Sequence, residues 1–252
     1  MTTTAKPRNN PVSGGLYLLR GLGLITRKGV KRYVALPLLI NILVFSVAIW
    51  FAAGQLEILD AWLDSQLPGW LEWLTWLLWP LFVLAMALAV FFGFSLLANI
   101  IAAPFNGFLA AAVERQLTGR GEEDTGRGLV REVAVTLLAE LRKLLFFVGW
   151  AIPLLIVSFI PVINVAAPFL WALFGAWMLS IEYTDFPMGN HGITFPGQRR
   201  ILARRRLLTL GFGGTATVAL LVPFVNFLVI PVAVAGATAM WVDQLSAHRD
   251  AA

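Results

Sequence analysis

Six consecutive residues, Arg27-Lys28-Gly29-Val30-Lys31-Arg32, place four cations around a glycine directly before a long apolar stretch. If a helix begins near Val30 or Lys31, its free N–H groups and positive dipole end point toward the side chains of Lys31 and Arg32. Gly29 has no Cβ, so a ligand can approach the backbone closely there. These groups together suit a compact oxyanion.

A second interpretation of the same residues needs no ligand site. Cations that flank a membrane span fix its orientation and attract anionic lipid. On this interpretation the segment from Arg27 to Arg32 is a membrane anchor that contacts only lipid phosphate. The residues alone leave both interpretations open.

A second group of charges follows the next apolar stretch. Most of its members interleave with apolar residues at helical spacing, which is typical of a solvated helix face. Glu114 and Arg115 differ, because their predicted helix directly follows a broken span, and we treat them as candidate pore-lining charges. The remaining members are Arg131, Glu132, Glu140, Arg142 and Lys143.

Enzyme chemistry finds no support in the sequence. The chain has no cysteine and two histidines, His191 and His248, which excludes thiolate chemistry and leaves a metal site short of ligands. It has no glycine-rich phosphate loop in a strand–turn–helix context. We interpret Asn190-His191 as structural, and we expect no catalytic residue, no metal and no cofactor.

The composition is that of a membrane protein. Of the 252 residues, 59% are hydrophobic and 13% are charged, whereas soluble domains are about half apolar and a quarter charged. We therefore predict an all-α integral membrane protein formed by one domain, residues 1–252. The net charge of +5 indicates a cytoplasmic surface next to anionic lipid, not a nucleic-acid partner.

The N-terminal half contains the two longest predicted spans. We expect a flexible segment over 1–13, an interfacial helix over 14–28 and a spanning helix over 33–56, whose 24 uncharged residues are about 36 Å long as a helix. A second span, 76–103, returns the chain and is ended by Pro104-Phe105-Asn106-Gly107. Cytoplasm-side amphipathic helices then cover 105–145.

An acidic loop is expected between these two spans. Glu57 to Glu72 contains four acids and no base. A group of tryptophans lies on and after this loop, and indoles favour the headgroup region. We interpret them as an aromatic belt on the outer face; core packing is the alternative. The group comprises Trp62, Trp70, Trp73, Trp76 and Trp79.

Two further uncharged blocks, 144–181 and 207–242, predict helical hairpins. Each is interrupted in its middle by a similar phrase, Pro161-Val162-Ile163-Asn164 and Pro223-Phe224-Val225-Asn226. The halves have about 15 to 18 residues, at or below the usual minimum for spanning. The hairpins therefore either cross fully or are re-entrant, penetrating part-way and returning.

The basic residues predict the orientation. All 19 Lys and Arg fall on one side of the predicted topology, under either hairpin model. The excess of Lys and Arg marks the cytoplasmic side. We therefore predict cytoplasmic N- and C-termini.

Four phrases resemble the CysZ family of bacterial sulfate permeases, and the likeness extends from about Gly14 to Asp243. The resemblance implies a multi-pass inner-membrane, channel-like protein that supplies sulfate for cysteine biosynthesis. It also implies two long spanning helices, partly penetrating hairpins, and a homodimer or larger assembly. The phrases are GVKRYVALPLLIN (29–41), AAPFNG (102–107), DFPMGNH (185–191) and PVAVAGATAMWVD (231–243).

The family's sulfate-binding motif, Gly-Leu-Arg followed by Arg, matches Gly29, Val30, Lys31 and Arg32. Lys31 replaces the first arginine of the motif, which keeps the charge but loses the planar two-pronged hydrogen bonding that suits oxyanions. Glu114 matches the family's charged third helix, whereas Arg115 lies one place from the family arginine.

The resulting hypothesis is sulfate transport without ATP hydrolysis, with sulfate and membrane lipid as partners. With this topology, however, the motif faces the cytoplasm, so it would serve release or regulation and cannot form the whole path. The alternative is a non-conducting membrane assembly or anionic-lipid-binding protein.

Overall fold

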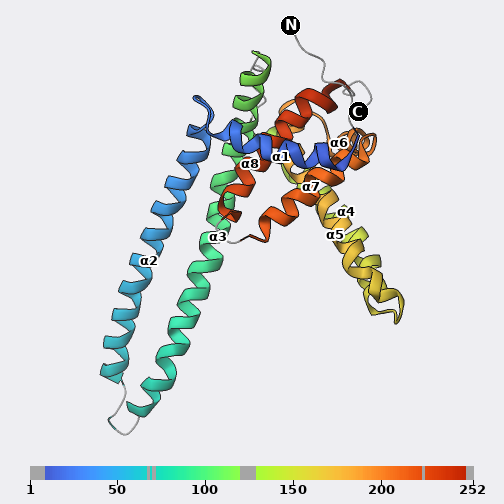
Figure 1. Ribbon diagram of the computed structural model, residues 1–252. Coiled ribbons are helices and arrows are strands. Elements are labelled where there is room, and N and C mark those ends of the chain that lie inside the picture. Colours follow the sequence, from blue (N-terminus) through green and yellow to red (C-terminus); the bar gives the residue numbers. More distant parts are fainter. Residues whose placement is uncertain (1–8, 67–68, 70–71, 120–128, 223–224, 248–252) are drawn as a thin grey trace. The chain divides into compact units, whose positions relative to one another are not determined.

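The structure is a computed structural model that describes residues 9–66, 69, 72–119, 129–222 and 225–247. Every regular element in these ranges is helical (Figure 1), as the apolar sequence predicts. The chain divides into two compact units: Arg32–Phe105, and Met1–Lys31 together with Asn106–Ala252. The single domain expected over 1–252 is thus divided, and each unit is described by itself.

The unit Arg32–Phe105 contains α2 (Arg32–Gln66) and most of α3 (Glu72–Thr118), which run antiparallel (Figure 1). At about 1.5 Å per residue, the 35 residues of α2 extend about 52 Å, more than the roughly 30 Å of a hydrocarbon core. Apolar side chains such as Leu43, Trp50 and Phe92 are 64%, 77% and 66% exposed on these helices. A surface of this kind suits lipid rather than water.

The boundaries of α2 correct the expected loop. The helix does not end at Leu56 but continues to Gln66, so Glu57 and Asp60 lie on a helix. Apolar residues persist there at helical spacing, and Leu63 is only 3% exposed. This continued apolar face keeps the chain helical beyond the uncharged run.

The expected break at Pro104-Phe105-Asn106-Gly107 is also corrected. Pro104 lies inside α3, which continues to Thr118. A proline removes one backbone hydrogen bond, which an apolar helix tolerates where neighbouring groups compensate. The phrase instead marks the boundary of the two compact units, which falls between Phe105 and Asn106.

The larger unit begins with α1 (Pro11–Ile25), where Asn10 accepts a 2.7 Å hydrogen bond from the Ser13 amide as N-cap. Residues 11–13, expected to be flexible, are thus helical. The chain later enters α7 (Arg206–Leu220) and α8 (Asn226–Met240), and α1 packs against both. Residues Ala233 to Ala235 and Met240 have no exposed surface, so α8 forms the core.

Glycines bring these helices close together. A Cβ built on Gly21 of α1 would lie 2.1 Å from the Val232 carbonyl oxygen of α8. One built on Gly14 would lie 2.1 Å from the Leu208 oxygen of α7, and one on Gly213 would lie 1.8 Å from the Ala176 oxygen of α5 (Ala167–Asn190). Helices in membranes approach closely where small residues face each other.

The chain turns near Pro161 to Asn164, within the block for which a hairpin is predicted, and the helices on either side are longer than the predicted arms. They are α4 (Leu129–Phe159) and α5 (Ala167–Asn190), joined through the 3-10 helix η2 (Ile163–Ala166). The amphipathic segment expected before residue 144 and the first hairpin arm form one helix, because no residue between them breaks the helical pattern.

The second hairpin is shorter and differently packed. Its first arm, α7, has 15 residues, or about 22 Å. Its second arm continues from α8 into a π-helical turn, η3 (Trp241–Leu245). The phrase Pro223-Phe224 lies outside the described residues. Between the hairpins, α6 (Phe195–Ala203) buries Phe195, Ile201 and Leu202.

Candidate functional site

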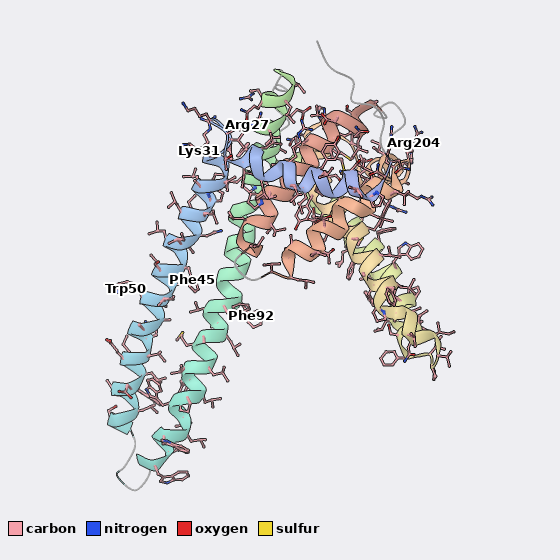
Figure 2. All side chains as sticks on the ribbon, in the orientation of Figure 1. Arg27, Lys31, Phe45, Trp50, Phe92 and Arg204 are labelled. Atoms are coloured by element: carbon pink, nitrogen blue, oxygen red, sulfur yellow. The ribbon has the colours of Figure 1, made fainter. Side chains whose placement is uncertain are left out.

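The segment from Arg27 to Lys31 is a tight turn that follows α1 (Figure 2). The amides of Val30 and Lys31 each donate to the Arg27 carbonyl oxygen over 3.1 Å. Gly29 has a φ of +89°, a conformation that favours glycine, and nothing lies within 4 Å of a Cβ built on it. Val30 is 1% exposed and holds the turn, whereas the Lys31 side chain is exposed.

Arg32 begins α2 and belongs to the other compact unit. Its Nη2 donates to the Tyr33 hydroxyl over 2.9 Å, and its guanidinium carbon lies 4.8 Å from the centre of the Tyr33 ring. The structure therefore supports a turn with an accessible backbone at Gly29 and an ordered cation at Arg32. A joint site of Gly29, Val30, Lys31 and Arg32 stays a prediction.

Glu114 has a partner that the sequence did not reveal. Its carboxylate oxygens lie 2.8 Å and 3.0 Å from Nε2 of His191, which is 77 positions away in the chain. The two side chains are 17% and 9% exposed. Arg115, in the last turn of α3, is exposed. The two candidate pore charges thus occupy different environments within the same unit.

His191 is held in place by its neighbours. The Asn190 side-chain amide donates to the Gly107 carbonyl oxygen over 3.1 Å, and the Trp241 ring lies 5.2 Å from the imidazole centre to centre. The phrases 102–107, 185–191 and 231–243 therefore contact one another around Glu114. Their polar residues were the available signal, but a single sequence does not say which of them pair.

A second buried charge, Lys143, joins α4 to α5. Its side chain is 7% exposed and forms ion pairs with Asp185, with Glu140 over 2.8 Å, and with Glu182 over 3.7 Å. The Gln198 side-chain amide of α6 donates to the same Asp185 carboxylate. The sequence pattern predicts a solvated face for Lys143. This prediction is wrong, because three acids from α4 and α5 enclose its ammonium group.

Comparison with known proteins identifies the family of this chain. Residues 17–231 match the family model described as "Sulfate transporter CysZ/Etoposide-induced protein 2.4". This chain belongs to that family. A protein of Pseudomonas fluorescens (strain Pf0-1) named "Sulfate transporter CysZ" is 44% identical over 245 residues, which cover 94% of this chain and 96% of that relative.

This CysZ-family protein is a multi-pass membrane protein. Five helical segments among the described residues are long and apolar enough to cross a bilayer. The segment Leu228–Leu245 is 72% buried inside the protein, whereas the other four are at most 17% buried. The α8 segment is therefore enclosed by protein. The four exposed segments are Arg32–Leu63, Trp76–Gly93, Glu140–Phe159 and Ile163–Asn190.

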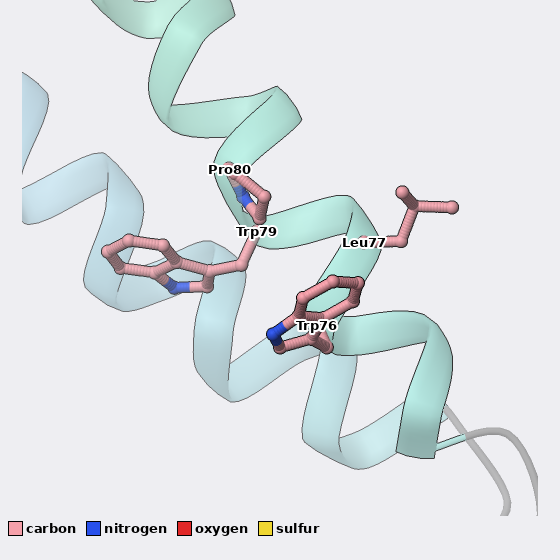
Figure 3. Close-up of a pocket in the computed structure, with 4 residues that line it drawn as sticks. All are labelled: Trp76, Leu77, Trp79 and Pro80. Carbon is pink, nitrogen blue, oxygen red and sulfur yellow. The ribbon is translucent and has the colours of Figure 1, made fainter.

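The tryptophans near the α2–α3 connection are surface residues of their unit. Trp76 and Trp79 line a shallow hollow with Leu77 and Pro80 (Figure 3). Trp62, Trp73 and Trp76 are 56%, 64% and 83% exposed. Exposure of these indoles is consistent with the predicted aromatic belt and contradicts core packing for these three residues.

One further ion pair connects the two ends of the larger unit's sequence. Asp243, in the π-helical turn, pairs with Arg20 and accepts a 3.2 Å hydrogen bond from the Tyr17 hydroxyl. The contact fixes α1, and with it the start of the basic turn, to η3. Among the described residues, no cluster of His, Cys, Asp and Glu could hold a metal ion.

Proposed function

We propose that this CysZ-family protein conducts sulfate across the bacterial inner membrane and supplies it to cysteine biosynthesis. The observation that carries the proposal is the 44% identity, over nearly the whole of both chains, to a relative named as a sulfate transporter. Transport would be driven by a gradient or by ion coupling, because the sequence contains no nucleotide-binding motif.

The proposed sulfate site comprises Gly29, Val30, Lys31 and Arg32. Three observations support it: the positive φ of Gly29, the open space beside that residue, and the exposed Lys31 side chain. An oxyanion there would accept hydrogen bonds from the cationic side chains of Lys31 and Arg32. With N- and C-termini in the cytoplasm, as the basic residues predict, this site would release or sense sulfate.

Glu114 and Arg115 are proposed to line the path. Glu114 is nearly buried and bonded to His191, so its orientation is fixed, whereas Arg115 is exposed at the end of α3. The fixed Glu114 carboxylate would be held away from sulfate by its bond to His191, while the exposed Arg115 guanidinium would offer the anion a counter-charge. We further propose a homodimer or larger assembly, to be measured by light scattering of the purified protein; a single-chain mass would contradict it.

Sulfate flux tests the function. Proteoliposomes that contain the wild-type protein should take up radiolabelled sulfate well above empty liposomes. The Lys31→Ala/Arg32→Ala variant should lose most of this uptake, because two of the proposed sulfate ligands are removed. Uptake equal to that of empty liposomes would favour a non-conducting assembly instead.

Calorimetric titration with sulfate tests the site separately from flux. The Lys31→Ala/Arg32→Ala variant should bind sulfate at least about a hundredfold more weakly or not at all, because two charge-assisted hydrogen bonds of about 1.5–3 kcal/mol each are lost. The matched control, Arg204→Ala/Arg206→Ala, removes the same charge elsewhere and should bind as the wild type does. If Lys31→Ala/Arg32→Ala binds sulfate as tightly as this control, the basic turn is a membrane anchor and not a sulfate site.

A further inference from the structure

Five arginines and no lysine occur between Arg199 and Arg206, in α6, the turn that follows it and the first residue of α7. Arg200, Arg204 and Arg206 are exposed, while Arg199 and Arg205 are half-buried. A positive charge that only sets topology can be lysine or arginine, as in the mixed basic turn at Arg27–Arg32. Arginine differs by offering a planar pair of donors that matches a phosphate group.

The height of these arginines relative to the membrane follows from three helices of the same unit. The uncharged runs of α4, α5 and α7 end at Leu144, Ile181 and Leu207. The 3.7 Å contact between Lys143 and Glu182 shows that the ends in α4 and α5 lie at one level. The third end, Leu207, directly follows Arg206. The arginines thus lie where hydrocarbon gives way to headgroups.

A cation–π contact fixes α6 at this level. The guanidinium carbon of Arg199 lies 3.9 Å from the centre of the Phe146 ring, which belongs to the first uncharged turn of α4. Phe195, Gln198 and Ile201 of α6 are buried, whereas Arg200 is exposed. The short helix therefore buries an apolar face and exposes a cation, in the manner of an interfacial amphipathic helix.

Exposed apolar side chains lie on α4 and α7, on the uncharged side of these ends. Leu144, Trp150 and Leu207 are 57%, 56% and 50% exposed. A free anion has no use for such a surface, whereas an acyl chain does. Arg204 lies at the end of its unit away from the α4–α5 tip (Figure 2).

We propose that Arg200, Arg204 and Arg206 form a binding site for the phosphate of an anionic phospholipid, with the acyl chains against Leu144, Trp150 and Leu207. The Asn9 side chain accepts a hydrogen bond from the Leu208 amide, so the start of α1 lies at α7, while the basic turn follows its other end. The 15 residues of α1 separate them by about 22 Å. The lipid site is therefore distinct from the proposed sulfate site.

Native mass spectrometry of the full-length protein in detergent tests the site, with phosphatidylglycerol, cardiolipin and phosphatidylcholine as probes. The wild type should retain the two anionic lipids in preference to phosphatidylcholine. Arg200→Gln/Arg204→Gln/Arg206→Gln should bind them at least about tenfold more weakly, since each arginine near the surface contributes on the order of a fivefold change in affinity. Equal retention of phosphatidylcholine by the wild type would overturn the proposal.

Two matched variants make the test specific. Arg27→Gln/Lys28→Gln/Lys31→Gln removes the same charge from the basic turn and should change lipid affinity less than twofold; an equal loss in both triple variants would mean general charge attraction and overturn the site. Arg200→Lys/Arg204→Lys/Arg206→Lys retains charge and folding and should still bind several-fold more weakly. Affinity equal to the wild type would overturn phosphate recognition by the arginine geometry.

Added sulfate separates the two sources of oxyanion. Sulfate at about 10 mM, in large excess over the protein, should leave the bound lipid in place. The lipid is held by its acyl contacts in addition to the phosphate contact. Displacement of the lipid by sulfate would overturn the lipid site in favour of a free anion. Calorimetric titration of Arg200→Gln/Arg204→Gln/Arg206→Gln with sulfate tests only the proposed sulfate site, so a failure of the lipid site can be told apart from a failure of the proposed function.

Discussion

At the scale of single residues, the most informative side chain is Lys143. It lies in the region where α4 changes from charged to uncharged, and it is balanced by acids from two helices. A buried ammonium group with hydrogen-bonded acids is tolerated, whereas acids left without their cation are costly. Lys143 therefore joins α4 to α5 through charge, at the level where both leave the apolar layer.

Substitution of Lys143 should destabilise the protein. Lys143→Met leaves Asp185 and Glu182 facing each other without a cation, and we expect a loss of about 2 kcal/mol or more of unfolding free energy at neutral pH. The measurement is thermal unfolding in detergent, followed by tryptophan fluorescence. The control is Glu140→Gln, whose side chain is 56% exposed and whose loss should cost about 1 kcal/mol or less. Equal effects of the two variants would contradict the central role of Lys143.

At the scale of elements, glycines decide which helix faces meet. Gly21 and Gly23 both lie in α1, two positions apart, but a Cβ on Gly21 would collide with the α8 backbone, whereas one on Gly23 meets nothing within 4 Å. Backbone atoms cannot rotate away as a side chain can, so the collision at Gly21 must be relieved by moving α1. Close packing of α1 on α8 thus depends on Gly21 in particular.

This difference gives a matched pair of variants. Gly21→Ala should lower the unfolding temperature by about 2–12 °C, because overpacking costs typically 1–3 kcal/mol and each kcal/mol shifts the temperature by about 2–4 °C. Gly23→Ala should leave it unchanged or raise it slightly, because alanine favours helix by about 1 kcal/mol over glycine. Thermal unfolding in one detergent measures both, and a lower temperature for Gly23→Ala than for Gly21→Ala would refute the packing argument.

At the scale of the whole molecule, the two hairpins differ in reach. The segments Glu140–Phe159 and Ile163–Asn190, with 20 and 28 residues, are long enough to cross a bilayer. The 15 residues of α7 extend only about 22 Å, less than a hydrocarbon core of about 30 Å. We therefore infer that the α4–α5 tip reaches the outer surface and that the α7–α8 tip ends within the membrane.

Single cysteines test this difference, since the natural chain contains none. Asn164→Cys should react with a membrane-impermeant maleimide added outside intact cells, because Asn164 lies at the α4–α5 tip. Leu221→Cys, directly after α7, should be protected. Permeabilised cells carrying Ser246→Cys, near the C-terminus that the basic residues predict to be cytoplasmic, provide the positive control. Rapid labelling of Leu221→Cys from outside would show that the second hairpin crosses fully.

The sequence by itself determined the class of the protein and the extent of its apolar segments. Burying a charge in lipid is costly wherever it occurs, so uncharged runs and clustered arginines mark membrane segments without reference to their neighbours. The turn after α4 and the exposed tryptophans were predictable for the same reason. The continuation of α2 to Gln66 and of α3 through Pro104 was not, because helix ends depend on how neighbouring groups satisfy the backbone.

Only the tertiary structure decided which polar residues meet. Glu114 and His191 are 77 positions apart, and Lys143 and Asp185 are 42 apart. Each pair forms because close packing of helices brings together side chains that are remote in the chain. The order of charges in one sequence contains no record of such contacts. Local composition therefore determined where the protein lies in a membrane, while helix packing determined the partners of its few buried charges.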